Sequence, residues 1–405
     1  MNIALLFQGI ATLFAADPVT SIARVTLIVL GVILVVLGSK NILEPLIMVP
    51  MGFGMMAINC AVLIIGVNEL GQMVTGNIFV DPMISDVSEI MDMLQVDFLQ
   101  PIYTLTFSNG LIACLVFMGI GVMTDVGCVL AYPFTSMLIA FCAELGTLIV
   151  FPIAVSMGFA PQEAASIALI GGADGPMVLF SSLIMSKDLF VPITIVAYLY
   201  LSLTYGGYPF LVRLMIPKRL RAIVPDKDTR IGEVTRSEKL AFAIIACALL
   251  CLLFPVAAPL FMSFFLGVAI REANITKYVK LLEDTILYIS TFFLGLLLGV
   301  LCDASTILDP RVLKLLILGM LALLLSGIGG IVGGYFVYFI SRKKFNPTIG
   351  IAGVSCVPTT AKVAQKEASH VNKQAIILPY ALAANVSGVI TTAIITGLYV
   401  AFLYH

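Results

Sequence analysis

The residues best suited to chemistry in this chain are polar side chains set in apolar sequence. Asp174 lies in the motif GGADGP, with apolar segments close on both sides. Gly171 and Gly172 allow the backbone to leave helical geometry, and Pro176 removes an amide donor. The motif therefore predicts a helix break that frees carbonyl oxygens beside a carboxylate, which suits a small cation such as Na⁺. The alternative is a solvent-exposed turn between helices.

A second break is predicted at NPTIGIAGVSCVPTT, residues 346–360. Asn346, Gly350 and Ser355 offer neutral oxygens that could complete a cation site with Asp174. The alternative is a packing surface, because small residues also let membrane helices approach closely. Asn385 lies in the last apolar segment, where it either hydrogen-bonds to a neighbouring helix or ligates an ion.

Other reactive side chains lie beside these two motifs. Three tyrosines follow GGADGP in the next apolar segment: Tyr198, Tyr200 and Tyr205. They are either packing residues or, where one faces the site, a proton relay. Lys362 follows Ser355 by seven residues and would share its helix face. It either pairs with an anion or reaches to water at the membrane surface together with Lys366.

The elements that must position these residues are membrane helices. The 405 residues are 60% hydrophobic and only 11% charged, with a mean hydropathy of +1.11, whereas soluble domains carry about 25% charged residues. We expect an all-α polytopic membrane protein with about 9–11 membrane segments of about 20 residues each, and no nucleic-acid partner. Two histidines and eight scattered cysteines without a CxxC pair leave little for histidine catalysis or a metal cluster.

Nine apolar runs are candidate spans: 22–38, 45–66, 111–123, 135–157, 189–212, 240–256, 283–301, 312–340 and 375–403. Shorter apolar pieces lie between them: 126–133, 162–173, 177–186, 258–270 and 347–361. These pieces are too short to span and rich in Gly, Pro and small polar residues. Since irregular backbone at membrane depth must be surrounded by protein or a wet cavity, they predict broken or re-entrant helices.

Charge and repetition predict the domain organisation. No Lys or Arg lies between Lys40 and Lys187, whereas 213–239 is strongly basic and therefore predicted to be cytoplasmic. The segments 117–133 and 292–310 resemble each other, each with an aspartate (Asp125 or Asp303) before a proline. We expect two inverted repeats with broken helices, the architecture of secondary transporters. The predicted parts are an N-terminal interfacial segment, a first membrane repeat with an acidic extracytoplasmic insert at 67–101, a basic cytoplasmic linker and a second membrane repeat: 1–21, 22–212, 213–239 and 240–405.

Five motifs together resemble one family, the β subunit of the Na⁺-pumping biotin-dependent decarboxylases: EPLIMVPMGFG, FMGIGVMTDVG, IGGADGP, NPTIGIAGVSCVPTTAKV and AANVSGVI. Members act on oxaloacetate, methylmalonyl-CoA, glutaconyl-CoA or malonate, a choice made by another subunit. The resemblance implies a multi-pass protein of the cell (inner) membrane that decarboxylates carboxybiotin, consumes a proton and moves Na⁺ outward. It also implies partners: a carboxyltransferase α subunit, a biotin carrier subunit, a small single-span γ or δ subunit, membrane lipid, and further copies of β, as a trimer.

The resemblance also assigns roles. In this family the aspartate of GGADGP is a Na⁺ ligand, here Asp174, and the further Na⁺ ligands fall on Asn346, Gly350, Ser355 and Asn385. A tyrosine implicated with the serine in ion or proton handling falls on Tyr200. The family's arginine for the carboxybiotin carboxylate is Lys362 here, which keeps the charge but loses the bidentate geometry.

Two other functions fit the same sequence. A stand-alone Na⁺-coupled carrier, either a carboxylate symporter or a Na⁺/H⁺ antiporter, would also use inverted repeats and a site at the membrane midplane. A membrane anchor for a soluble enzyme would need neither Asp174 nor two matching breaks.

Overall fold

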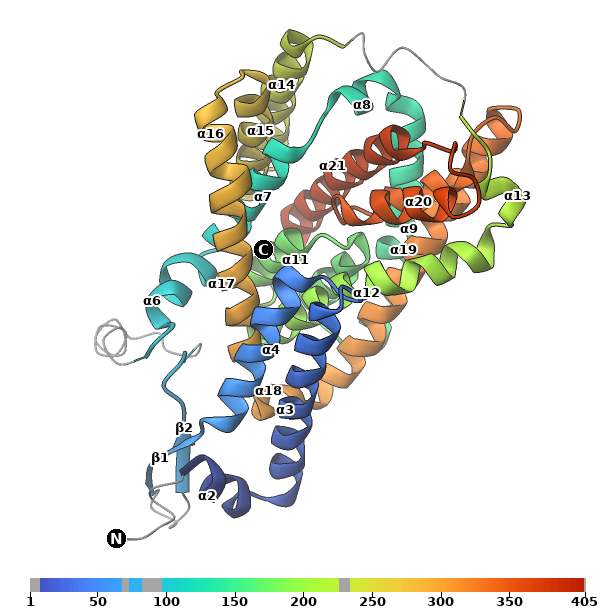
Figure 1. The fold of residues 1–405 in the computed structure, drawn as a ribbon. Helices are drawn as coiled ribbons and strands as arrows, with labels where there is room; N and C mark the ends of the chain where they lie inside the picture. Colours follow the sequence, from blue (N-terminus) through green and yellow to red (C-terminus); the bar gives the residue numbers. More distant parts are fainter. Residues whose placement is uncertain (1–7, 68–72, 82–96, 226–233, 404–405) are drawn as a thin grey trace. The chain divides into compact units, whose positions relative to one another are not determined.

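The protein is an α-helical membrane protein, described by a computed structural model, in which two short antiparallel strands pair within the described residues (Figure 1). The structure describes residues 8–67, 73–81, 97–225 and 234–403. Most of the acidic insert and the centre of the basic linker lie outside these ranges. The chain forms two compact units, residues 1–112 with 289–314 and residues 113–288 with 315–405. This division follows contacts and not the predicted halves, so the two inverted repeats and the four predicted parts stay predictions.

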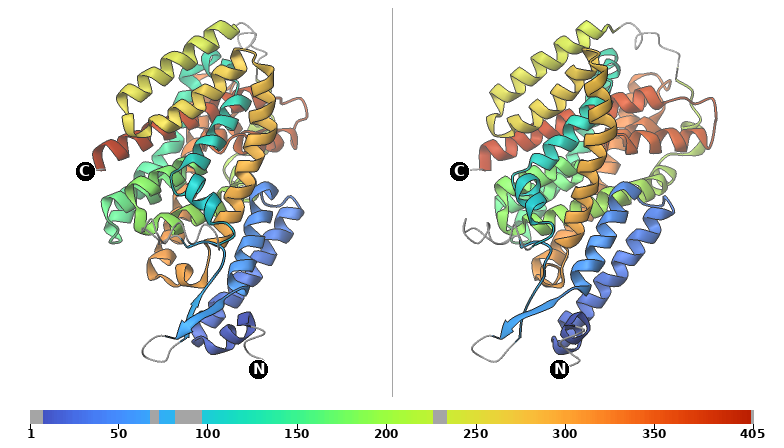
Figure 2. Two further views of the ribbon diagram at one scale, coloured as in Figure 1. Left: turned by 90° about the vertical axis from the view of Figure 1, so that its left-hand side faces the viewer. Right: turned by 60° about the vertical axis from the view of Figure 1, so that its left-hand side comes forward.

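The first unit is built around two antiparallel apolar helices. Its elements are α2 (Gln8–Ala15), α3 (Pro18–Ser39), α4 (Pro45–Cys60), β1 (Leu63–Val67), β2 (Met73–Gly76), α6 (Gln100–Ile102), η1 (Tyr103–Phe107), most of α17 (Leu287–Val300) and α18 (Ala304–Leu308). Asp17 caps α3 by accepting from the amides of Val19 and Thr20, and Pro18 occupies the first helical turn. The views of Figure 2 agree with Figure 1 that α3 and α4, in blue, run side by side.

The second unit holds the remaining helices. They are α7 (Leu111–Met123), α8 (Gly127–Ala131), α9 (Pro133–Ser156), α10 (Pro161–Ala168), η2 (Leu169–Gly172), α11 (Gly175–Met185), η3 (Lys187–Leu189), α12 (Phe190–Met215), α13 (Lys218–Arg221), α14 (Arg236–Leu253), η5 (Pro255–Ala257), α15 (Ala258–Glu272), α16 (Thr276–Lys280), η6 (Leu281–Ile286), most of α19 (Pro310–Ile340), η7 (Pro347–Gly353), α20 (Thr359–Ser369) and α21 (Leu378–Leu403). Its largest apolar core joins α9, α10, α12, α19, α20 and α21.

Within the described residues, seven helices are long and apolar enough to cross a membrane: Pro18–Ser39, Pro133–Ser156, Lys187–Met215, Pro255–Glu272, Thr276–Val300, Pro310–Ile340 and Leu378–Leu403. The pair Gln100–Phe107 and Leu111–Met123, bent by 64°, adds an eighth if it forms one span. Two shorter apolar helices, Pro45–Cys60 and Gly175–Met185, also occur. The prediction of a polytopic α-helical membrane protein is confirmed.

Three predicted segments differ from the structure. The span predicted over 45–66 is wrong, because α4 ends at Cys60 and the β-branched residues that follow pair as β1 with β2. The piece 258–270, predicted to be too short, is part of a span-length helix once Pro255–Ala257 is included. The helix predicted over 240–256 forms as α14. Three charged residues in its first turn make it too polar to count among the seven candidate membrane spans.

Candidate ion-binding and catalytic site

The GGADGP motif forms the predicted break inside the second unit. Helix α10 tightens into the 3₁₀ turn η2, Ala173 adopts a left-handed conformation with φ 56°, and α11 starts at Gly175. Asp174 caps α11, its carboxylate accepting from the amide of Met177 at 3.3 Å. The side chain is only 4% exposed, so the alternative of a solvent-exposed turn is wrong. Burying a carboxylate at membrane depth costs free energy, and such residues are rare and usually functional.

The second motif also breaks and lies against the first. Residues Pro347–Gly353 form the 3₁₀ turn η7, and α20 begins at Thr359. Between them, Ser355 donates to the carbonyl of Gly172 twice, from its amide at 3.1 Å and from its hydroxyl at 2.6 Å. The two breaks that the sequence predicted therefore meet at the carbonyl of Gly172, two residues before Asp174.

Asn385 joins α21 to the second break. Its amide nitrogen donates to the carbonyls of Ala352 at 3.1 Å and Val354 at 3.0 Å, and to the hydroxyl of Thr360 at 2.9 Å. Its amide oxygen is buried without a hydrogen-bond partner. The interhelical hydrogen bond is thus confirmed, while an oxygen remains for an ion. The ligand role of Asn385 stays a prediction.

Asn346 and Gly350 have structural partners of their own. The side chain of Asn346 accepts from the amide of Thr348 at 3.0 Å and donates to the carbonyls of Arg221 at 3.0 Å and Ile223 at 2.9 Å. A Cβ on Gly350 would contact the carbonyl oxygen of Gly330 on α19, so the packing interpretation of this glycine is confirmed. Their Na⁺-ligand roles stay predictions.

Of the tyrosines on α12, the structure brings Tyr198 to the GGADGP turn. A Cβ built on Gly175 would lie 2.8 Å from the Tyr198 hydroxyl, which is buried without a hydrogen-bond partner. Tyr200 instead donates its hydroxyl to the carbonyl of Leu316 on α19 at 2.7 Å. Tyr198 therefore adjoins the Asp174 turn, although the sequence did not single it out above its neighbours, and the catalytic role of Tyr200 stays a prediction.

The lysines after the second break lie on the exposed face of α20. Lys362 and Lys366 are both exposed, one helical turn apart. The Lys366 ammonium lies 5.7 Å from the ring centroid of Tyr205, within the range of a cation–π contact. This face could attract a carboxylate arriving from the aqueous side.

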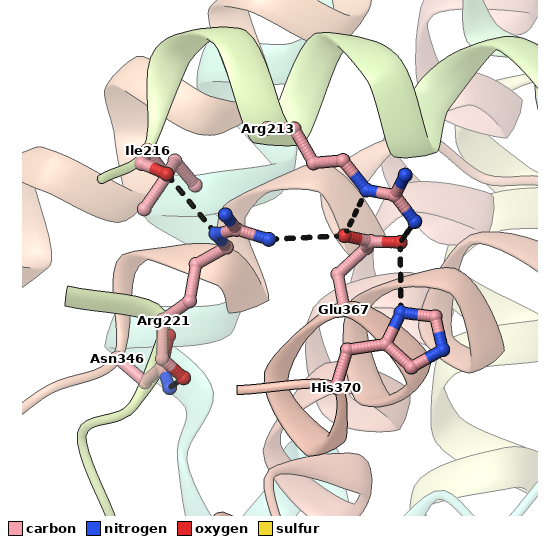
Figure 3. A network of polar contacts seen from close by, with 6 residues as sticks. All are labelled: Arg213, Ile216, Arg221, Asn346, Glu367 and His370. Carbon is pink, nitrogen blue, oxygen red and sulfur yellow. Dashed lines mark hydrogen bonds and ion pairs between the residues drawn. The ribbon is translucent and has the colours of Figure 1, made fainter. Parts of the chain in front are cut away.

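A buried ion-pair network holds α20 against the end of α12 (Figure 3). Arg213 donates to both carboxylate oxygens of Glu367, at 2.8 and 2.7 Å, and Arg221 donates to one of them at 3.1 Å. The His370 Nδ1 atom lies 3.6 Å from Oε1 of Glu367. Burial raises the pKa of Glu367, but the hydrogen bond and charge of Arg213, together with the charges of His370 and Arg221, lower the pKa overall. The network fixes the helix that carries Lys362 and Lys366.

Asp125 and Asp303, the matching aspartates of the two resembling segments, belong to local turns. Asp303 caps α18, accepting from the amide of Thr306 at 2.8 Å. Asp125 accepts from the amide of Gly127 at 2.9 Å and from the Lys239 ammonium at 2.8 Å. A capping role is confirmed for Asp303.

One buried carboxylate in the second unit was missed. Glu144 is the only charged residue of α9 and is 1% exposed. It accepts a hydrogen bond from the Thr392 hydroxyl, which in turn lies 3.2 Å from the Ser355 hydroxyl. The sequence carries a signal for it, because a lone glutamate in a predicted membrane span indicates a functional residue. The residues that the structure describes hold no cluster of three His, Cys, Asp or Glu.

The comparisons with known proteins confirm the resemblance. Residues 23–403 match the family described as Na⁺-transporting oxaloacetate decarboxylase beta subunit. A carboxybiotin decarboxylase of Malonomonas rubra is 55% identical, covering 98% of both chains. The methylmalonyl-CoA decarboxylase subunit beta of Veillonella parvula is 34% identical over 71% of this chain and 77% of the relative. The oxaloacetate decarboxylase beta chain of Klebsiella pneumoniae is 33% identical over 74% and 70%. The protein is therefore a membrane-embedded member of the β-subunit family of Na⁺-transporting decarboxylases.

Proposed function

We propose that this chain decarboxylates carboxybiotin carried by a partner subunit and uses the reaction to move Na⁺ outward across the cell membrane. One observation supports this most strongly. A buried carboxylate, Asp174, lies at a broken helix whose carbonyl at Gly172 is held by Ser355 of a second broken segment. Half-helix ends and freed carbonyls at membrane depth are how membrane proteins bind transported cations.

The ion would bind to the Asp174 carboxylate and neutral oxygens around it. Ser355 and Asn385 lie on the elements that close the site, and Asn385 has an oxygen to spare. Asn346 and Gly350 would act by fixing the second break, in addition to the ligand roles that the resemblance implies. A single carboxylate with neutral oxygens balances one monovalent charge, which permits both entry and release.

The chemical step would use the exposed face of α20. Lys362 would attract the carboxylate of carboxybiotin, and the C–N bond to the ureido nitrogen breaks to release CO₂. The electron pair stays on that nitrogen, which takes up one proton. Tyr200 is the proposed proton-handling group by family resemblance, with Ser355, and Tyr198 is the tyrosine that adjoins the Asp174 turn. A proton delivered to Asp174 would remove the charge that holds Na⁺, which couples the two processes.

The proposed partners are a biotin carrier subunit, a carboxyltransferase α subunit, a small single-span γ or δ subunit and further β copies as a trimer. Two relatives are named as a subunit beta and a beta chain, which supports an assembly with other chains. The carboxyl donor would be chosen by the α subunit.

The test measures CO₂ release from free carboxybiotin by the purified complex as Na⁺ is varied. Wild type should require Na⁺, and Asp174→Asn should lose at least tenfold in rate because the site loses its charge. Asp303→Asn is the matched control, since the hydrogen bonds of Asp303 are local to the first turn of α18 and Asn also caps helices. A rate unchanged in Asp174→Asn would contradict the assignment of the site.

A further inference from the structure

Glu144 leaves half of its carboxylate without a partner. Oε1 accepts from Thr392, but Oε2 is buried without a hydrogen bond. No Lys or Arg in the described part of the chain forms an ion pair with it. Burying an ionised carboxylate without a compensating charge is strongly unfavourable. The group is therefore built to hold a proton or a cation.

Hydroxyl oxygens from three helices lie around the Gly171–Gly172 turn, next to Glu144. Ser326 on α19 is 1% exposed, and its hydroxyl has no hydrogen-bond partner. A Cβ built on Gly171 would lie 2.9 Å from the Ser326 hydroxyl and 3.0 Å from the Thr147 hydroxyl. A Cβ built on Gly172 would lie 3.0 Å from the Thr392 hydroxyl and 3.3 Å from Glu144 Oε1. One carboxylate and three hydroxyls thus converge on the Gly171–Gly172 turn.

The glycines make this convergence possible. Gly146 lies two residues after Glu144 on α9, and a Cβ there would contact both the amide and the hydroxyl of Ser326. Without a side chain at Gly146, α19 can approach α9 closely, which places Ser326 against the turn of α9 that carries Glu144. The close approach therefore serves the polar cluster and not only apolar packing.

We propose that Glu144 is the carboxylate of a second Na⁺-binding position, completed by the hydroxyls of Thr392, Ser326 and Thr147. Hard cations are bound by carboxylate, hydroxyl and carbonyl oxygens, and one carboxylate matches one monovalent ion. This position is separate from Asp174. The Gly171–Gly172 turn and the contact of Thr392 with Ser355 connect the two. The proposal rests on the proposed Na⁺ transport and assigns it a second ion.

The test measures equilibrium binding of ²²Na⁺ to the purified complex. Carboxybiotin is left out, so that the assay measures Na⁺ binding without turnover. Wild type should bind two ions per β chain. Glu144→Gln and Asp174→Asn should each bind one, and the double variant none. Wild-type binding that Glu144→Gln leaves unchanged would overturn the proposal and show that Glu144 is a protonated hydrogen-bonding residue. A wild type that binds no Na⁺ would overturn the proposed function as well.

A milder variant protects the test against misfolding of Glu144→Gln. Ser326→Ala removes one hydroxyl and should weaken one of the two Na⁺ affinities about two- to tenfold, as the loss of one polar contact predicts. Ser263→Ala is the matched control, because Ser263 is a buried hydroxyl of the same unit that donates within its own helix to Pro259. Equal Na⁺ affinities in the two serine variants would also overturn the proposal.

Discussion

Replacing Glu367 by Gln removes the charge that holds Arg213 at the end of α12 and Arg221 at the end of α13. The carboxylate is fully buried and accepts from Arg213 and Arg221. The Arg221 side chain is only 7% exposed and would remain as a buried cation, whereas that of Arg213 is 47% exposed and can turn to water. Breaking a buried pair by removing one partner costs about 3–5 kcal/mol. We expect the free energy of unfolding of Glu367→Gln to fall by about this amount, mainly because of Arg221.

The assay follows helix content by circular dichroism as SDS is titrated into the purified complex in mixed micelles. Glu238→Gln is the control, because Glu238 belongs to an exposed capping box in which Gln also serves. The double variant with Arg221→Gln should be less destabilised than the sum of the two single changes, since it no longer leaves a buried cation.

The sign of the pH dependence follows from the lowered pKa of Glu367. Its contribution is present above the ordinary carboxyl pKa of 4.5 and is lost as the pH falls through the lowered value of the folded protein. Glu367→Gln should abolish this loss. Two results would contradict the claim that Glu367→Gln leaves Arg221 as a buried cation. One is a free energy of unfolding within about 1 kcal/mol of wild type. The other is a double variant with Arg221→Gln whose destabilisation equals the sum of the two single changes.

Three further changes test other contacts of the second unit. Gly350→Ala should cost about 1–3 kcal/mol, because its Cβ contacts the carbonyl of Gly330; the same SDS titration measures it, and wild-type stability would contradict the close approach. Ser355→Ala should lose about 0.5–1.5 kcal/mol of stability and raise the Na⁺ concentration for half-maximal activity, whereas an unchanged Na⁺ dependence would separate Ser355 from the ion site. Burial raises the pKa of Asp125, but the Lys239 hydrogen bond, the Gly127 amide and the charges of Lys239 and Arg271 lower it overall. These contacts therefore stabilise the protein above pH 3.8 by at most about 1 kcal/mol, which is lost on acidification. Asp125→Asn should lack this loss.

The sequence predicted the breaks better than the spans. The glycines and prolines of GGADGP and NPTIG act locally, and both motifs form 3₁₀ turns where predicted. By contrast, the end of α4 at Cys60 depends on the pairing of β1 with β2, which an apolar run does not reveal. A short apolar run such as residues 62–65 is equally compatible with a helix or a strand.

The candidate site was predicted in part. Asp174, Ser355 and Asn385 lie on elements that meet, since a carboxylate, a hydroxyl and an amide stand out in apolar sequence. Tyr198 and Tyr200 could not be told apart, because they are two residues apart on one helix and only packing decides which one faces the turn. Glu144 was overlooked although its charge alone marked it.

The most direct test of the account reconstitutes the complex in liposomes and follows ²²Na⁺ uptake and CO₂ release on addition of free carboxybiotin. We expect both to occur together in wild type and both to be lost in Asp174→Asn. Na⁺ movement indifferent to carboxybiotin would identify a stand-alone carrier and contradict the proposed coupling.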